Sequence, residues 1–151
     1  MFKKILVANR GEIATRITWA CHELGDKTVA VYPKEDEYSA HRFAADEAYL
    51  IGQGEKPIDA YLDIDEIIRV AKESGAEAVH PGYGFLAENA DLAQACADNG
   101  LKFIGPKPEH LRMFGNKLEA KKVAVEAGLK PIPGLSGNIK DVEQVRTFAH
   151  Q

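Results

Sequence analysis

The chain has 151 residues, enough for one domain with its own core, and its 45% hydrophobic and 28% charged residues are ordinary for a soluble protein. The net charge of -4 excludes a general electrostatic attraction to nucleic acid or to an anionic membrane. No apolar run approaches the roughly 20 residues that span a bilayer, and the first residues lack the pattern of a signal peptide. We therefore expect a cytoplasmic protein, or a mitochondrial one without its transit segment.

The first two thirds of the chain alternate short apolar runs with amphipathic stretches. Residues 5–8 predict a buried strand, the turn at residues 9–11 leads into a helix that ends at Gly25, and residues 28–32 predict the next strand. Further strands are predicted at residues 48–51, 76–79 and 101–104, with a loop and short helix at 33–45 and helices capped by Asp63 and Asn89. Glu66 is expected to return the bond to Asp63, which would complete a capping box. This alternation predicts an α/β fold, a Rossmann-like parallel sheet of about five strands with helices on both faces.

The first helix has two different faces. Its predicted buried stripe consists of Ile13, Ile17, Ala20, Cys21 and Leu24. Its opposite face carries Glu12, Arg16, Trp19 and Glu23. An outward tryptophan is consistent either with a lone surface aromatic or with a subunit or domain interface, where Trp and Arg are enriched.

Residues 80–89 (HPGYGFLAEN) follow the fourth strand at its carboxyl end, where open α/β sheets bind ligands. Two glycines flank Tyr83, so the backbone can turn sharply and approach a bound group. A tight turn with a packing tyrosine is the alternative. We expect His80 to be a hydrogen-bonded structural residue, and a capping role suffices for Glu88 beside Asn89.

The pattern changes after Gly105, where two consecutive helices precede a Pro/Gly-rich stretch at residues 131–137 and a further amphipathic helix from Asp141. Because the chain stops inside that helix, we expect the front end of a longer polypeptide. We predict a Rossmann-like domain at residues 1–113, a helix and linker at 114–134, and the start of another region at 135–151.

Lys117 lies in the first turn of the second of these helices, where backbone amides present partial positive charge. A phosphate would suit this place, although this feature alone favours an exposed lysine pointing into water. The turn at residues 9–11 contains only Gly11 in place of the three glycines of a dinucleotide-binding fingerprint, so a nicotinamide enzyme is disfavoured. We find no P-loop and no metal-ligand spacing, and we expect no metal ligands in this chain.

Three motifs together resemble the N-terminal domain of biotin carboxylases. They are residues 5–14 (ILVANRGEIA), 80–89 (HPGYGFLAEN) and 103–107 (FIGPK). The resemblance runs along the whole chain in the same order. Residues 56–64 and 38–43 resemble the pyruvate carboxylase branch more than the acetyl-CoA carboxylase branch.

The resemblance implies an ATP-grasp enzyme that activates bicarbonate with ATP and Mg²⁺ and places the carboxyl group on a biotin held by a carrier domain. In such enzymes this first domain has the pre-ATP-grasp fold. Residues 135–151 are then the truncated start of the ATP-grasp region, and the glycine-rich lid and the metal carboxylates of the family come later, outside these 151 residues. We therefore expect no catalytic residue within these 151 residues, and no activity of this chain alone.

The resemblance also assigns residues. Lys117 matches a lysine that contacts ATP, Tyr83 and Gly84 match residues beside the biotin ring and bicarbonate, and Glu88 matches a carboxylate of the same pocket. It places Arg16, Trp19 and Glu23 at a dimer interface, with Trp19 departing from the arginine common at that position. The alternatives are a biotin carboxylase subunit of an acetyl-CoA or propionyl-CoA carboxylase, or a non-catalytic Rossmann-like docking module.

Overall fold

The five apolar runs form one parallel sheet in the computed structural model, which describes residues 2–132 and 141–149. The strand order is β3-β2-β1-β4-β5, and all four neighbouring pairs are parallel. The strands are β1 (Lys4–Val7), β2 (Lys27–Tyr32), β3 (Glu47–Leu50), β4 (Ala78–His80) and β5 (Lys102–Phe103). The predicted α/β class and the number of strands are confirmed. Apolar runs without alternation, such as KILV in β1, form strands that are buried on both faces of the sheet.

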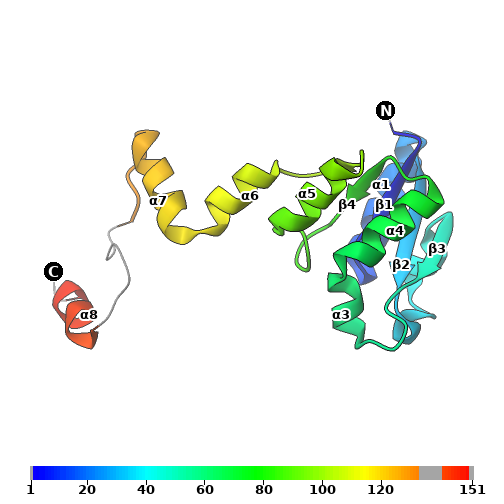
Figure 1. The fold of residues 1–151 in the computed structure, drawn as a ribbon, viewed down its shortest axis with the longest axis horizontal. Coiled ribbons are helices and arrows are strands. Elements are labelled where there is room, and N and C mark those ends of the chain that lie inside the picture. The colour runs from blue at the N-terminus through cyan, green and yellow to red at the C-terminus, as the bar shows by residue number, and fades with distance from the viewer. Residues whose placement is uncertain (1, 133–140, 150–151) are drawn as a thin grey trace. The chain divides into compact units, whose positions relative to one another are not determined.

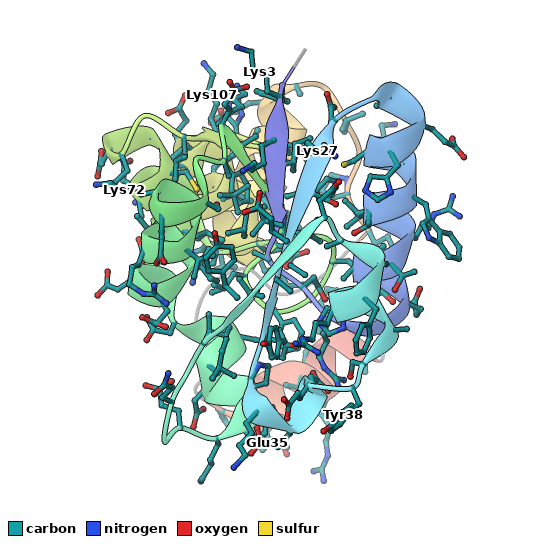
Figure 2. All side chains as sticks on the ribbon, turned by 90° about the vertical axis from the view of Figure 1, so that its right-hand side faces the viewer. Lys3, Lys27, Glu35, Tyr38, Lys72 and Lys107 are labelled. Carbon is teal, nitrogen blue, oxygen red and sulfur yellow. The ribbon has the colours of Figure 1, made fainter. Side chains whose placement is uncertain are left out.

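Helices cover both faces of this sheet (Figure 1). In the first of two compact units, Met1–Leu111, the helices are α1 (Gly11–Leu24), the 3₁₀ helix η1 (Lys34–Asp36), α2 (Ala40–Ala44), α3 (Pro57–Leu62), α4 (Ile64–Ser74) and α5 (Ala90–Asp98). Successive strand residues point to opposite faces, so Ile5 and Val7 pack with α1 whereas Leu6 packs with α4 and α5. Figure 2 shows α1 in blue on one side of the strands and the green helices on the other.

The second compact unit is Arg112–Gln151. Helix α6 (Pro108–Gly115) crosses from the first unit into it, and α7 (Lys117–Glu126) and α8 (Val142–Ala149) follow. Residues 133–137 of the Pro/Gly-rich stretch lie outside the described residues, and the predicted domain boundaries stay predictions. None of the described helices combines the length and the hydrophobicity that spanning a bilayer requires.

The buried stripe of α1 differs from the predicted one. Ala14, Ile17, Thr18 and Cys21 are buried, whereas Ala20 is exposed and the Leu24 side chain is 62% exposed. The buried positions follow i, i+3, i+4, i+7 spacing, which centres the stripe on Ala14 and Cys21 and leaves Ala20 and Leu24 on its flank.

One further local prediction needs correction, and one helix was not predicted. The Asp63 carboxylate caps α4 by accepting from the Glu66 amide at 3.1 Å, but the Glu66 carboxylate pairs with Arg69 at 2.8 Å instead of returning the bond. The capping box is therefore half formed. Helix α3 was not predicted, although Pro57 at its first turn is a typical start signal.

A buried carboxylate, Asp36, connects segments that follow β1, β2 and β3 at the carboxyl edge of the sheet. Arg10 donates to both of its oxygens at 2.6 Å, Tyr61 donates its hydroxyl at 2.8 Å and Ser39 donates at 3.0 Å. The Arg10 hydrogen bond holds the pKa of Asp36 well below its usual range. Each carboxylate oxygen accepts two donors, so a charge that would be costly to bury alone is satisfied.

His41 lies beside this cluster and is fully buried. Its Nε2 is 3.3 Å from the Val31 carbonyl oxygen and 3.4 Å from the Tyr61 hydroxyl, and its Nδ1 has no hydrogen-bond partner among the described residues. Burial lowers the pKa of the His41 imidazole, although the nearby Asp36 charge opposes this effect and the Arg10 charge adds to it.

We predict that Leu92→Ala lowers the free energy of unfolding by about 2–5 kcal/mol, because Leu92 of α5 is fully buried in the main core and its loss leaves a cavity. Leu24→Ala is the matched control, with an expected loss below about 1 kcal/mol at an exposed position. Urea denaturation of both variants measures the difference. Equal losses would contradict the packing described here.

We predict that stability falls as the pH drops below about 6.5, in part because of His41. The unfolded chain binds a proton on this histidine at a pKa of about 6.5, whereas the folded chain binds it only at lower pH. The unfolded state therefore holds more protons in this window, and one such group changes stability by up to about 1.4 kcal/mol per pH unit.

Unfolding free energies measured between pH 5 and 7.5 check this, since Asp36 and the other carboxyls begin to matter only at lower pH. His41→Gln is expected to flatten the dependence, whereas His110→Gln, at an exposed position, is expected to keep it. His80 remains in both variants, so its own contribution cancels from the comparison. An unchanged slope in His41→Gln would contradict a contribution of His41 to the pH dependence of stability.

Candidate functional site

The turns after β1 and β4 meet at the switch point of the sheet. From β1 the chain continues outward to β2 and β3, and it then returns to the other side of β1 to form β4 and β5. The carboxyl ends of β1 and β4 therefore open into the crevice where such sheets bind ligands. In Figure 2, Lys3 and Lys27 mark the amino end of the sheet, and Glu35 and Tyr38, which follow β2, mark the carboxyl end.

Asn9 joins these two turns. Its side chain is 2% exposed, and its Nδ2 donates to the Pro81 carbonyl at 2.7 Å and to the Tyr83 carbonyl at 2.8 Å. Gly82 has a positive φ of 65°, and a Cβ there would come within 2.7 Å of the Asn9 amide nitrogen. Only glycine therefore fits at this close approach.

Tyr83 projects from the turn with 60% of its surface exposed. Its hydroxyl donates a hydrogen bond to the Glu12 carboxylate at the start of α1, and this bond raises the pKa of Tyr83. Gly84 follows in an exposed position with a φ of 67°, and Glu88 is exposed on the same turn before the capping residue Asn89. The structure thus places Tyr83, Gly84 and Glu88 on one turn at the switch point.

His80 supports the turn from within. Its Nδ1 accepts a hydrogen bond from the Gly82 amide at 3.1 Å, and burial lowers the pKa of its imidazole. A neutral imidazole whose Nδ1 is already bonded has the structural role expected of it.

Phe85 completes the turn in a strained conformation. It has a φ of 40°, a left-handed value that is costly for a residue with a bulky side chain, by roughly 1–2 kcal/mol. Its ring stacks on that of Tyr61, with centroids 5.2 Å apart and planes 19° apart. The stacking on a buried ring helps to hold Phe85 in this conformation.

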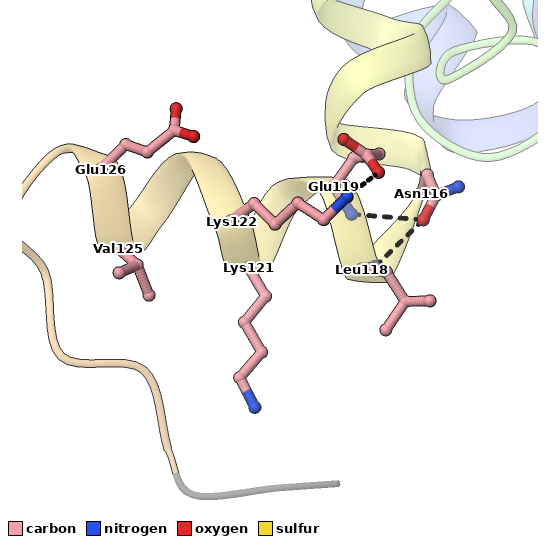
Figure 3. Close-up of a pocket in the computed structure, with 7 residues that line it drawn as sticks. All are labelled: Asn116, Leu118, Glu119, Lys121, Lys122, Val125 and Glu126. Carbon is pink, nitrogen blue, oxygen red and sulfur yellow. Dashed lines mark hydrogen bonds and ion pairs between the residues drawn. The ribbon is translucent and has the colours of Figure 1, made fainter. Parts of the chain in front are cut away.

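Lys117 is the first residue of α7 and lies in the second unit. Asn116 caps this helix, its Oδ1 accepting from the Leu118 amide at 3.0 Å and the Glu119 amide at 3.3 Å (Figure 3). The Leu118 and Glu119 amides thus already have a partner, and the phosphate site expected at this helix end stays a prediction. The group that remains available to contact a phosphate is the exposed ammonium group of Lys117.

Figure 3 shows a hollow along α7. Its lining residues are Asn116, Leu118, Glu119, Lys121, Lys122, Val125 and Glu126. All of them belong to one helix and its cap, so this hollow has no second wall within that set. It carries no site assignment.

Arg16, Trp19 and Glu23 are exposed on the outer face of α1, as predicted, and Trp19 is 62% exposed. Arg16 also borders an apolar groove between α1 and the sheet, which reaches from Phe2 to Tyr83. For metals, the described part of the chain contains no group of three or more His, Cys, Asp or Glu side chains placed to hold an ion.

Sequence reasoning did not identify Asn9, Asp36, Tyr61 or Phe85 as parts of the site. Asn9 and Phe85 lie inside motifs that were recognised, and a buried asparagine directly after a strand is a signal that its amide needs partners. Asp36 lies in the stretch predicted as a loop with a short helix, and Tyr61 lies in residues 56–64, which served only for the family resemblance. Their partners are 25 or 26 residues away in sequence, so nothing local revealed them.

Comparison with known proteins agrees with the resemblance. The family model described as "Biotin carboxylase, N-terminal domain" matches residues 1–111. The pyruvate carboxylase of Bacillus subtilis is 58% identical over 146 residues, which is 97% of this chain and 13% of that protein. The mitochondrial pyruvate carboxylase of Rattus norvegicus is 55% identical over 148 residues, or 98% of this chain and 13% of that protein.

Two solved structures are similar as well. The complete multifunctional pyruvate carboxylase of Rhizobium etli has a TM-score of 0.84 at 50% identity, covering 89% of this chain and 13% of that one. The biotin carboxylase domain dimer of Hydrogenobacter thermophilus 2-oxoglutarate carboxylase, in complex with MgADP, ADP and bicarbonate, has a TM-score of 0.91 at 49% identity. That match covers 99% of this chain and 33% of that one.

The chain therefore spans about one eighth of the length of the curated relatives described above. Because the family model covers residues 1–111, the whole first unit, the chain belongs to the biotin carboxylase N-terminal domain family.

Proposed function

We propose that this chain is the N-terminal part of a biotin carboxylase that uses MgATP and bicarbonate to carboxylate biotin on a carrier domain, within an enzyme of the pyruvate carboxylase type. The observation that carries the proposal is the turn with Tyr83 and Gly84, held by Asn9 at the switch point of the sheet. In such an enzyme the carboxyl group passes from biotin to pyruvate, giving oxaloacetate. Identities above 50% to two pyruvate carboxylases support this acceptor.

A different acceptor is the second candidate. The small subunit of Hydrogenobacter thermophilus 2-oxoglutarate carboxylase is 48% identical over the whole chain, so the same domain type serves other carboxylases. Biotin carboxylase subunits of acetyl-CoA and propionyl-CoA carboxylases are further alternatives, as is a docking module without catalysis. The first chemical half-reaction is common to all the carboxylases.

In the proposed site, Tyr83 and Gly84 form one wall for the biotin ring and bicarbonate. The hydrogen bond to Glu12 holds the Tyr83 hydroxyl at α1, which fixes the ring without covering it. Gly84 lets the backbone come close to the ligand, and Glu88 adds a carboxylate to the same pocket. The opposite wall, the lid and the magnesium ligands are proposed to lie outside this chain.

When bound, ATP would supply the phosphoryl group that activates bicarbonate and would leave as ADP, and magnesium would neutralise the phosphate charge. Lys117 is proposed to neutralise phosphate charge through its ammonium group, because the Leu118 and Glu119 amides already bond Asn116. Its place in the first turn of α7 supports this, since the helix dipole also favours an anion there.

We further propose that the protein forms a homo-oligomer through Arg16, Trp19 and Glu23 on α1. A largely exposed tryptophan between charged residues suits an interface, where aromatic residues bury large areas. A dimer of the corresponding domain is named for the Hydrogenobacter thermophilus structure.

For location we propose the cytoplasm. The named bacterial relatives support this, whereas the Rattus norvegicus relative is mitochondrial, so a mitochondrial compartment is the alternative.

The proposal predicts that the full-length protein releases ADP from ATP only when bicarbonate is present, and faster with free biotin. The 151-residue chain alone is predicted to show no such activity. A coupled ADP assay measures both. ATP cleavage that ignores bicarbonate would contradict the proposed function, and activity of the isolated chain would contradict the need for parts outside it.

Lys117→Gln in the full-length enzyme is predicted to raise the KM for ATP by roughly 10- to 100-fold, the loss expected for a charge-assisted hydrogen bond of about 1.5–3 kcal/mol. The control is Lys122→Gln on the same helix, which pairs with Glu119 and is expected to leave this KM unchanged. An unchanged KM in Lys117→Gln would return this lysine to an ordinary surface role.

Trp19→Ala is predicted to weaken self-association of the full-length protein by at least tenfold, because the exposed indole offers the largest apolar area of the α1 outer face. Sedimentation over a range of concentrations measures the dissociation constant. Tyr38→Ala, at another strongly exposed aromatic position, is the control and is expected to change nothing. Identical association of all three proteins would remove α1 from the interface.

A further inference from the structure

We propose that Tyr61 is a positioning residue for the biotin and bicarbonate pocket and acts through its ring contact with Phe85. This inference deepens the proposed function and rests on it. Tyr61 belongs to α3, and its contact with the turn that follows β4 brings together two segments more than 20 residues apart in sequence.

The turn needs support at Phe85. Among the described residues, Phe85 is the one non-glycine residue with a positive φ, and it directly follows Gly84 and Tyr83. Such a conformation persists only where the surroundings hold it in place. The stacked ring of Tyr61, 5.2 Å away, supplies that support on the core side of the turn.

Tyr61 is itself fixed. Its side chain is 2% exposed, and its hydroxyl donates to Asp36 at 2.8 Å. Asp36 is held in turn by the two-pronged Arg10 contact and by Ser39. A ring with one end anchored to a bound carboxylate has a defined plane, so it presents a fixed surface to Phe85.

The two supports of the turn are connected. Asn9 holds the Pro81 and Tyr83 carbonyls, and the next residue, Arg10, holds the carboxylate that anchors Tyr61. The turn is therefore supported at Tyr83 by Asn9 and at Phe85 by Tyr61, and Gly84 lies between the two points. Loss of the Tyr61 ring removes the support at Phe85, and the Gly84 backbone then becomes more mobile next to the ligand.

The test uses the full-length enzyme and measures KM for bicarbonate, free biotin and ATP separately. Tyr61→Leu is expected to raise the KM for bicarbonate and for biotin about tenfold and to change the KM for ATP less than twofold. Tyr61→Phe keeps the ring and is expected to stay within about threefold of wild type. Tyr49→Leu is the matched control, because Tyr49 of β3 is partly buried against the same core and has no ring contact with Phe85 among the described residues.

Coupling provides the second measurement. Phe85→Leu is expected to reproduce the Tyr61→Leu effect, and the double variant is expected to add little, because both changes break one contact. The inference is overturned by additive effects, by an equal rise in the KM for ATP, or by a Tyr49→Leu variant that behaves like Tyr61→Leu.

The inference and the proposed function fail in different ways. If the wild-type enzyme shows no bicarbonate-dependent ATP cleavage, the function is wrong. Amide hydrogen exchange at residues 82–88 then still tests the contact: exchange at least tenfold faster in Tyr61→Leu than in Tyr49→Leu supports it, and equal exchange in the two variants refutes it.

Discussion

The turn after β4 keeps its shape because one buried side-chain amide holds it. Asn9 donates to the carbonyl groups of Pro81 and Tyr83, and a buried amide of this kind is costly unless its hydrogen bonds are made. The bonds exist only because β1 and β4 are neighbours, and they require glycine at position 82. Strand order, the Asn9 side chain and Gly82 thus form one constraint, and Tyr83 is presented to solvent as its result.

Asp36 places a buried negative charge at the same edge of the sheet, where Arg10 pairs with it. A carboxylate that accepts from Arg10, Tyr61 and Ser39 remains charged far into the acid range, because protonation would give up charge-assisted bonds. His41 beside it behaves in the opposite way, since burial disfavours its charged form. The cluster therefore connects the segments after β1, β2 and β3. At neutral pH its Asp36 carboxylate is charged and the neighbouring His41 imidazole is neutral.

Local sequence rules succeeded where one segment holds all the relevant atoms. The predicted caps at Asp63 and Asn89 are made by side chains two or three residues from the amides that they accept from. The same rules failed where a competing side chain or the packed sheet determines which contact forms. The Glu66 carboxylate prefers Arg69 to the expected return bond, and Leu24 lies on the flank of the α1 stripe because the sheet contacts Ala14, Ile17 and Cys21.

By itself the sequence determined the alternation of strands and helices, the outward position of Trp19 and, through its three motifs, the family and the turn that carries Tyr83, Gly84 and Glu88. Periodicity reveals which side of a strand or helix is buried, but it does not say which strands are neighbours. Only the tertiary structure decided that Asn9 meets Tyr83 across 74 residues and that Tyr61 stacks on Phe85. These contacts depend on the crossover that places β4 beside β1, a choice made by packing of the whole sheet.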